Sequence, residues 1–241
     1  MRILFLILIL ALAVGCAHLN RVPPGPPVTR EQVMQTAEAY ASHPWQATPA
    51  NAFHGTDTNG VRINTPDAAW WGPGGWFADG TTNIGVPYCW DGDSTLAEFD
   101  AGIRTGRPAG DQFKKLYRRS QSHPGPASSA LPVGVDCSGF VSRCWQLDKR
   151  RSTYDMARVC RRLRSFDDLL PGDAVNKRYD HIILFAGWVD AQHEQMRVFE
   201  AGDAQKNNLP ENYVRVHEDV YDRDWLTEKG FVPLRYEGIQ D

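Results

Sequence analysis

The residues best placed for chemistry surround Cys137, which lies between Asp136 and Ser138 where an apolar helical pattern begins. Asp136 or Ser138 can cap the first turn, so the thiol lies at or beside a helix N-terminus. Backbone N–H groups and the positive end of the helix dipole favour a thiolate there. A free cysteine is more often a small buried core residue, but this position predicts a nucleophile. The apolar residues of the same helix recur at spacings that form one buried face: Phe140, Val141, Cys144, Trp145 and Leu147.

A nucleophilic cysteine needs a base, and the base needs a group that orients it. His181 is the candidate base because it opens a continuous β-rich apolar run, so its ring can project from the end of a strand. A single histidine at a strand edge is more often a surface or core residue. Its combination with a cysteine at a helix N-terminus favours catalysis. The other histidines lie in linker, polar or loop settings: His18, His43, His54, His123, His193 and His217.

The strand that His181 opens is expected to form an antiparallel hairpin with the next apolar run. The two strands, His181 to Trp188 and Arg197 to Ala201, are separated by a short polar segment. We expect His181 opposite Glu200 and Trp188 opposite His193, with a loop over 189–192. This register brings an imidazole and a carboxylate together.

Three motifs follow one another in the chain: D-C-S-G-F-V at 136–141, L-L-P-G-D at 169–173 and D-H-I-I-L-F-A-G at 180–187. Together they resemble the NlpC-type cell-wall peptidases, which are papain-like cysteine peptidases of bacterial envelopes. The resemblance covers about Ile84 to Ala201. It implies an α+β, papain-like fold in which a central antiparallel sheet packs against the helix that carries the nucleophile. It also implies Cys137 as nucleophile, His181 as general base and Glu200 as the residue that orients the imidazole.

The chain departs from the family pattern at several points. The third position of the family is commonly His, Asn or Gln, whereas Glu200 would hold the imidazole by charge. P-Y-C-W-D-G at 87–92 resembles the family's tyrosine motif, but 137 − 92 leaves 45 positions before the cysteine. We therefore expect an insertion at about 93–130 that reshapes the groove. The resemblance implies that Tyr88, Asp136 and Ser138 bind the substrate, with Tyr88 and Asp136 around its free amino group.

The activity that the resemblance implies is hydrolysis of peptidoglycan stem peptides between γ-D-glutamate and the diamino acid. Backbone N–H groups at the helix N-terminus, including that of Cys137, would stabilise the oxyanion. One alternative keeps the chemistry but makes the protein an amidase or acyltransferase acting on a lipid, a polyamine or a modified peptide. Another is an inactive wall-binding lipoprotein. No metal or other cofactor is expected, because the sequence has no Cys-x-x-Cys and no His-x-x-x-His.

The N-terminal residues predict export and lipidation. Arg2 precedes a continuous apolar stretch, Ile3 to Ala13, and residues 1–15 therefore predict a signal peptide that is too short to span a membrane. A-V-G-C resembles the lipobox of bacterial lipoproteins, which implies lipidation of Cys16; an ordinary signal peptide is the alternative. Residues 16–28 form a proline-rich linker. We expect a membrane-anchored envelope protein, on the periplasmic face of the outer membrane if the cell is Gram-negative.

Composition is that of a globular protein: 241 residues, 42% apolar and 23% charged, with a net charge of −3. The charge gives no basic surface for nucleic acid. We expect a monomer with one domain over 29–241. A capping box starts a helix that runs from Thr29 to about Ser42. The aromatic residues of the loop at 68–80 either form one wall of a substrate groove or cover the core: Trp70, Trp71, Trp76 and Phe77.

Export places the remaining cysteines in an oxidising compartment. A bond between Cys137 and Cys144 is excluded, because seven residues of helix separate their Cα atoms by about 10 Å and a disulfide needs less than about 7 Å. A bond between Cys89 and Cys160 stays open. The other elements expected from the sequence are helices around 113–119 and over 152–163, a tight turn at 169–173 that leads to a strand, and short strands near 213–217 and 231–236.

Overall fold

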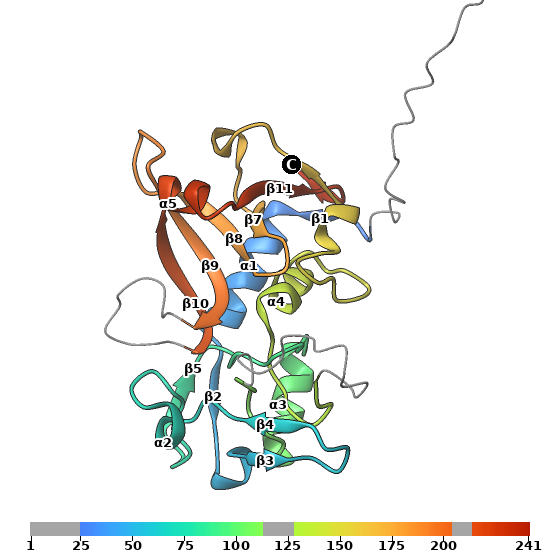
Figure 1. Cartoon of the computed structure of the whole chain (residues 1–241), viewed down its shortest axis with the longest axis vertical. Helices are drawn as coiled ribbons and strands as arrows, with labels where there is room; N and C mark the ends of the chain where they lie inside the picture. The colour runs from blue at the N-terminus through green and yellow to red at the C-terminus, as the bar shows by residue number, and fades with distance from the viewer. Residues whose placement is uncertain (1–24, 113–127, 204–213) are drawn as a thin grey trace, which may run out of the picture.

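The computed structural model describes residues 25–112, 128–203 and 214–241, and the fold is of the mixed α+β type. A six-stranded sheet in the order β10-β9-β8-β7-β11-β6 forms one half of the molecule in Figure 1, and every neighbouring pair is antiparallel. Its strands are β6 (Cys160–Arg162), β7 (Ala174–Lys177), β8 (His181–Trp188), β9 (Gln195–Asp203), β10 (Val214–Asp222) and β11 (Val232–Tyr236).

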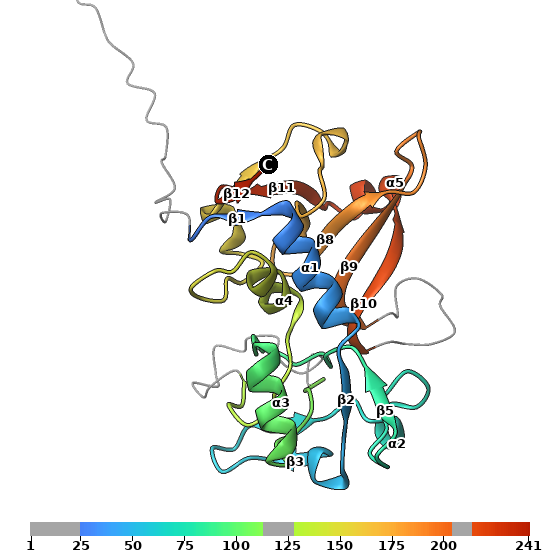
Figure 2. The same cartoon turned by 180° about the vertical axis from the view of Figure 1, so that it is seen from behind.

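The longer helices lie outside the sheet. α1 lies in front of the sheet in Figure 2, and α3 belongs to the other half of the molecule. The helices are α1 (Arg30–Ala41), α2 (Ala68–Trp71), α3 (Leu96–Arg104), α4 (Cys137–Cys144) and α5 (Arg223–Glu228). The small strands are β1 (Val28–Thr29), β2 (Pro44–Gln46), β3 (His54–Thr56), β4 (Arg62–Asn64), β5 (Thr82–Ile84) and β12 (Ile239–Gln240).

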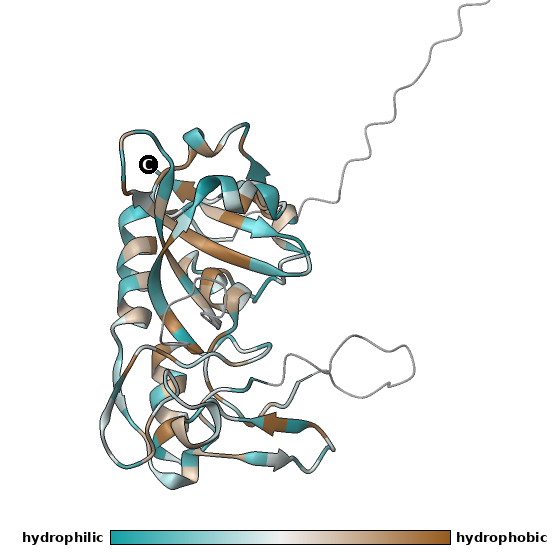
Figure 3. Cartoon of the chain, turned by 60° about the vertical axis from the view of Figure 1, so that its left-hand side comes forward, coloured by the Kyte–Doolittle hydropathy of each residue, from teal (hydrophilic) through white to brown (hydrophobic). Residues whose placement is uncertain are grey.

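Both faces of the sheet are covered by apolar side chains, and brown stretches follow its strands in Figure 3. One face packs against α1 and α4, with Leu184 and Phe199 of the sheet meeting Val33 of α1 and Phe140 of α4. The opposite face is closed by α5 and the segment before β7: Leu163, Leu169, Val175, Ile183, Phe185, Met196, Val198, Tyr221, Leu226 and Phe231.

Several elements expected from the sequence are confirmed. α1 begins with the Thr29–Gln32 capping box, and α4 begins at Cys137. The turn at 169–173 leads into β7 as expected, and the two final strands exist, although β10 continues to Asp222. The expected helix around 113–119 lies outside the described residues, as do the signal peptide, Cys16 and most of the linker.

The hairpin of β8 and β9 exists, but its expected register was wrong. Trp188 lies opposite Met196 instead of His193, and the pairing shifts between Phe185 and Gly187. The Asp190 carboxylate is the reason, since it accepts backbone hydrogen bonds from residues 192, 194 and 195 at 2.9, 3.0 and 2.7 Å and so organises a longer loop. His181 therefore lies diagonal to Glu200 on one face, within reach of a long side chain.

The helix expected over 152–163 was wrong, and a helix over 96–104 was missed. The first segment contains only a short 3-10 turn, Met156–Arg158, before β6, because the backbone of β6 pairs with β11. Pairing across the sheet outweighs a weak helical pattern. The missed helix α3 had a recognisable start, the capping box formed by Thr95 and Glu98. In the part of the chain that is described, no helix is both long and apolar enough to cross a membrane.

Candidate active site

Cys137 is the first residue of α4, and Asp136 caps that helix. Oδ1 of Asp136 accepts hydrogen bonds from the Gly139 N–H at 2.6 Å and from the Ser138 hydroxyl at 2.9 Å. The N–H groups of the first helical turn have no partner within the helix and point towards its N-terminus. Cys137 is 7% exposed. The sulfur is thus buried beside a group of donors that can bind a developing oxyanion.

The segment with the tyrosine motif, 87–92, packs directly against the N-terminus of α4, although a long inserted segment separates the two in the sequence. Gly92 accepts a hydrogen bond from the Asp136 N–H at 2.9 Å. A Cβ atom on Gly139 would lie 2.0 Å from the Gly92 oxygen, so only glycine fits at that position. Asp93 bridges to Val135 across the ends of the inserted segment. The inserted residues, which include α3, therefore leave the two motifs adjacent.

His181 and Glu200 form the second part of the site. His181 Nε2 lies 2.5 Å from Glu200 Oε2, and the two residues are 6% and 2% exposed. Cys137 lies close enough to His181 for its charge to raise the pKa of the imidazole. The structure therefore brings together the nucleophile, base and orienting residue that the sequence predicted, in the order cysteine, imidazole, carboxylate.

The charges of Cys137, His181 and Glu200 influence one another. Burial disfavours the imidazolium, but the charge and hydrogen bond of Cys137, followed by those of Glu200, outweigh it and raise the pKa of His181 to about 9. Burial also disfavours the Glu200 carboxylate, yet His181, His217 and Tyr221 lower its pKa to about 2. Between these values the histidine is held as a cation beside the sulfur and the glutamate as an anion behind it.

Glu200 has further partners on β10 that the sequence analysis did not identify. His217 is its direct partner across the strands, and His217 Nε2 lies 3.5 Å from Glu200 Oε1. The Tyr221 hydroxyl donates a 2.9 Å hydrogen bond to the same oxygen. Both residues are buried on the sheet face that carries Glu200. The alternation of His217, Asp219 and Tyr221 along one strand was the pattern that could have revealed them.

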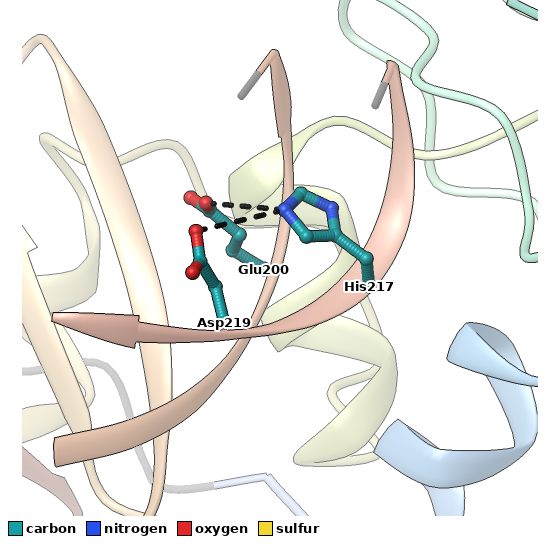
Figure 4. A group of neighbouring side chains, drawn as sticks. All are labelled: Glu200, His217 and Asp219. Carbon is teal, nitrogen blue, oxygen red and sulfur yellow. Dashed lines mark ion pairs between the residues drawn. The ribbon is translucent and has the colours of Figure 1, made fainter. Parts of the chain in front are cut away.

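Three of these side chains have the donor types of a metal site. Among the described residues, Glu200, His217 and Asp219 have ligand atoms that all lie within 4.8 Å of one another, and Figure 4 shows them directed towards a common point. Both oxygens of Glu200 already take part in hydrogen bonds, to His181 and Tyr221. A cation on the side of Glu200 that faces His217 would compete with the Tyr221 hydrogen bond at Oε1, so the cluster is better described as part of the hydrogen-bond network.

Arg150 was not predicted from the sequence. It connects Asp136, which caps α4, to the tyrosine motif. Its guanidinium pairs with Asp91 at 2.5 Å and, more closely, with Asp136. Burial opposes the cation, but the charges of Asp136, Asp91 and Cys137 raise the pKa of Arg150. Asp136 is therefore engaged as a helix cap and as an ion-pair partner. Ser138, which bonds to Asp136, is only 2% exposed, and Tyr88 is 4% exposed.

The aromatic residues of the loop at 68–80 differ in their burial. Trp76 belongs to the core, since it is 7% exposed and its Nε1–H donates to the Ala109 carbonyl at 2.9 Å. Trp70 and Phe77 are exposed. Phe77 lines a cavity of about 210 Å³ whose other walls include Trp45, Pro87 and Arg215. Two of these walls, Pro87 and Arg215, are joined by a backbone bridge.

The other cysteines of the described chain, Cys89, Cys144 and Cys160, are buried and not in disulfides. Burial raises the pKa of all three thiols. At pH 7 we therefore expect iodoacetamide to modify Cys137 at least about 100-fold faster than these three, because alkylation requires the thiolate. Peptide mapping by mass spectrometry over time would measure the four rates. Similar rates in the folded protein would contradict this expectation; in urea all four should react alike.

Comparisons with protein-family models, with curated proteins and with solved structures found no match to this chain. The geometry of Cys137, His181 and Glu200, together with the motifs that surround them, is what supports a function.

Proposed function

We propose that this protein is a cysteine endopeptidase of the bacterial envelope that hydrolyses amide bonds in peptidoglycan stem peptides. The single observation that supports the chemistry is the buried row of Cys137, His181 and Glu200 at the N-terminus of α4. The substrate rests on the resemblance of three motifs to NlpC-type peptidases. The papain-like form of the α+β fold is part of the same proposal, because a helix with the cysteine packs against an antiparallel sheet with the histidine.

The reaction would proceed by acyl transfer. The Cys137 thiolate attacks the amide carbonyl, and the N–H groups of the first turn of α4 hold the oxyanion of the tetrahedral intermediate. His181 gives its proton to the leaving amine as the C–N bond breaks. The resulting neutral imidazole then takes a proton from the water that attacks the thioester. Breakage of the C–S bond releases the acid and the Cys137 thiolate, which restores the thiolate beside the imidazolium. Glu200 keeps the imidazole in place throughout.

The location that we propose for the enzyme is based on the N-terminal sequence alone. We propose that Cys16 carries a lipid and that the proline-rich residues of 16–28 hold the domain away from the membrane. A monomer suits this arrangement, with the stem peptides of the wall as substrate.

The experiment that tests the function is digestion of purified peptidoglycan by a soluble protein starting at Ala17, with Cys137→Ala as control. Mass spectrometry should find new stem-peptide fragments from the wild type only, cut between γ-D-glutamate and the diamino acid. Absence of fragments combined with rapid iodoacetamide labelling of Cys137 would mean that the nucleophile is correct and the substrate wrong. Absence of both would favour the inactive wall-binding protein.

A different small amide is the second candidate substrate, and the engagement of Asp136 favours it. Asp136 bonds to the Gly139 N–H and the Ser138 hydroxyl and pairs with Arg150. The carboxylate expected to hold a substrate's free amino group is thus already neutralised by a neighbouring cation. An amidase or acyltransferase would give other products, so analysis of the products distinguishes the two candidates.

Activity should fall at alkaline pH as His181 loses its proton. The raised pKa of about 9 means that the imidazolium is present at pH 7 and is lost as the pH rises through 9. We expect kcat/KM to decline above about pH 9 in the wild type, and Glu200→Gln to shift this decline to lower pH because a supporting charge is removed. A pH series on a synthetic stem peptide measures both. An identical alkaline limb in the two proteins would show that Glu200 does not support the cation.

A further inference from the structure

The two oxygens of the Glu200 carboxylate contact different partners. Oε2 faces His181 at 2.5 Å, while Oε1 accepts the Tyr221 hydrogen bond at 2.9 Å and lies 3.5 Å from His217 Nε2. Glu200 is 2% exposed, so water cannot replace a lost partner at Oε1 without a change in packing. A buried acceptor left without its donor carries a desolvation cost. The contacts at Oε1 therefore decide how the carboxylate is oriented.

The sheet holds these partners in fixed places. Glu200 and His217 are paired across β9 and β10, and Tyr221 lies four residues further along the same face of β10. The His217 ring is itself fixed, because its Nδ1–H donates to the Arg215 carbonyl at 2.8 Å. Gly202 keeps the space beside the pair open, since a Cβ atom there would lie 3.2 Å from Glu200 Oε2 and 3.4 Å from the His181 ring.

We propose that Tyr221 and His217 are positioning residues of this site, which act through Glu200 by holding its carboxylate towards His181. The inference deepens the proposed function and rests on it. A glutamate side chain has several rotatable bonds, and a single contact to His181 would leave it free to rotate away. The Tyr221 hydrogen bond and the ion-pair contact of His217 at the second oxygen restrict that rotation, as the outer partners of metal-bound or catalytic histidines do in other sites.

The test is a double-mutant cycle between Tyr221→Phe and Glu200→Ala, with Tyr40→Phe as matched control. Tyr40 is equally buried and donates a 2.8 Å hydrogen bond to the Ser94 carbonyl, away from Glu200. Tyr221→Phe should lower kcat for the stem peptide about tenfold with little change in KM. It should have no further effect once Glu200 is alanine. Tyr40→Phe should keep the wild-type kcat.

Equal losses from Tyr221→Phe in both backgrounds would overturn the proposal, because the tyrosine would then act independently of Glu200. The same cycle is run on the rate of Cys137 alkylation by iodoacetamide, which needs no peptide substrate. Absence of peptide hydrolysis by the wild type would therefore defeat the proposed function, while the alkylation cycle still tests the positioning. His217→Gln provides a second cycle with the same expected non-additivity, of use if Tyr221→Phe does not fold.

Discussion

Cys137→Ala and His181→Ala should each lower kcat/KM for stem-peptide hydrolysis by at least about 10,000-fold, and the double variant should be no worse than either. We expect the two residues to act as one unit, because the charge of Cys137 supports the His181 cation and, in the proposed reaction, His181 supplies the proton for the leaving amine. If one of the two residues is removed, the remaining one can no longer contribute to the reaction. Initial rates with a synthetic stem peptide, measured for the three variants at one pH, would provide the comparison.

His43→Ala is the matched control for this set. His43 also pairs with a carboxylate, Asp100, at 2.7 Å, but it lies at the end of α1 and outside the site. Its loss should leave kcat/KM close to that of the wild type. Multiplicative losses in the double variant would contradict a catalytic unit of Cys137 and His181, and would require a separate role for each residue.

Asp173→Ala should cause the largest loss of stability of any single polar substitution proposed for this protein. Asp173 is fully buried and pairs with Arg30 at 3.1 Å and with Arg235 at 2.6 Å. Removing the carboxylate leaves two largely buried guanidinium groups without it, and breaking such a pair costs about 3–5 kcal/mol. For a domain of this size, about 3 kcal/mol lowers the Tm by about 6–12 °C. Thermal unfolding followed by circular dichroism measures the shift.

Asp241→Asn is the control for this prediction. Asp241 pairs with the same Arg30 at 2.6 Å, but its side chain is 79% exposed. Exposed ion pairs are screened by water and salt, so the Tm should not change measurably. Equal shifts for the two variants would show that burial of Asp173 does not determine its contribution.

The start of α4 was determined by the sequence itself. Asp136 caps the helix, and the apolar spacing after Cys137 follows one helical face, so both are read from residues only a few positions apart. The same holds for the Thr29 capping box and for the existence of the hairpin that begins at His181. Local hydrogen bonds and periodicity encode these features, which is why Cys137 and His181 could be named as candidates from the sequence. Glu200 was named from the family resemblance and from a hairpin register that the structure corrects.

The surroundings of those residues were decided only by the tertiary structure. The hairpin register depends on how the Asp190 carboxylate closes its loop. A strand, β6, formed where a helix was expected because its backbone pairs with β11. Arg150 reaches Asp136 across 14 positions of sequence, and Tyr221 reaches Glu200 across 21. A local pattern can indicate a polar strand face, as the alternation in β10 does, but it does not say which distant residue each side chain meets. That pairing and its burial exist only after distant segments have packed together.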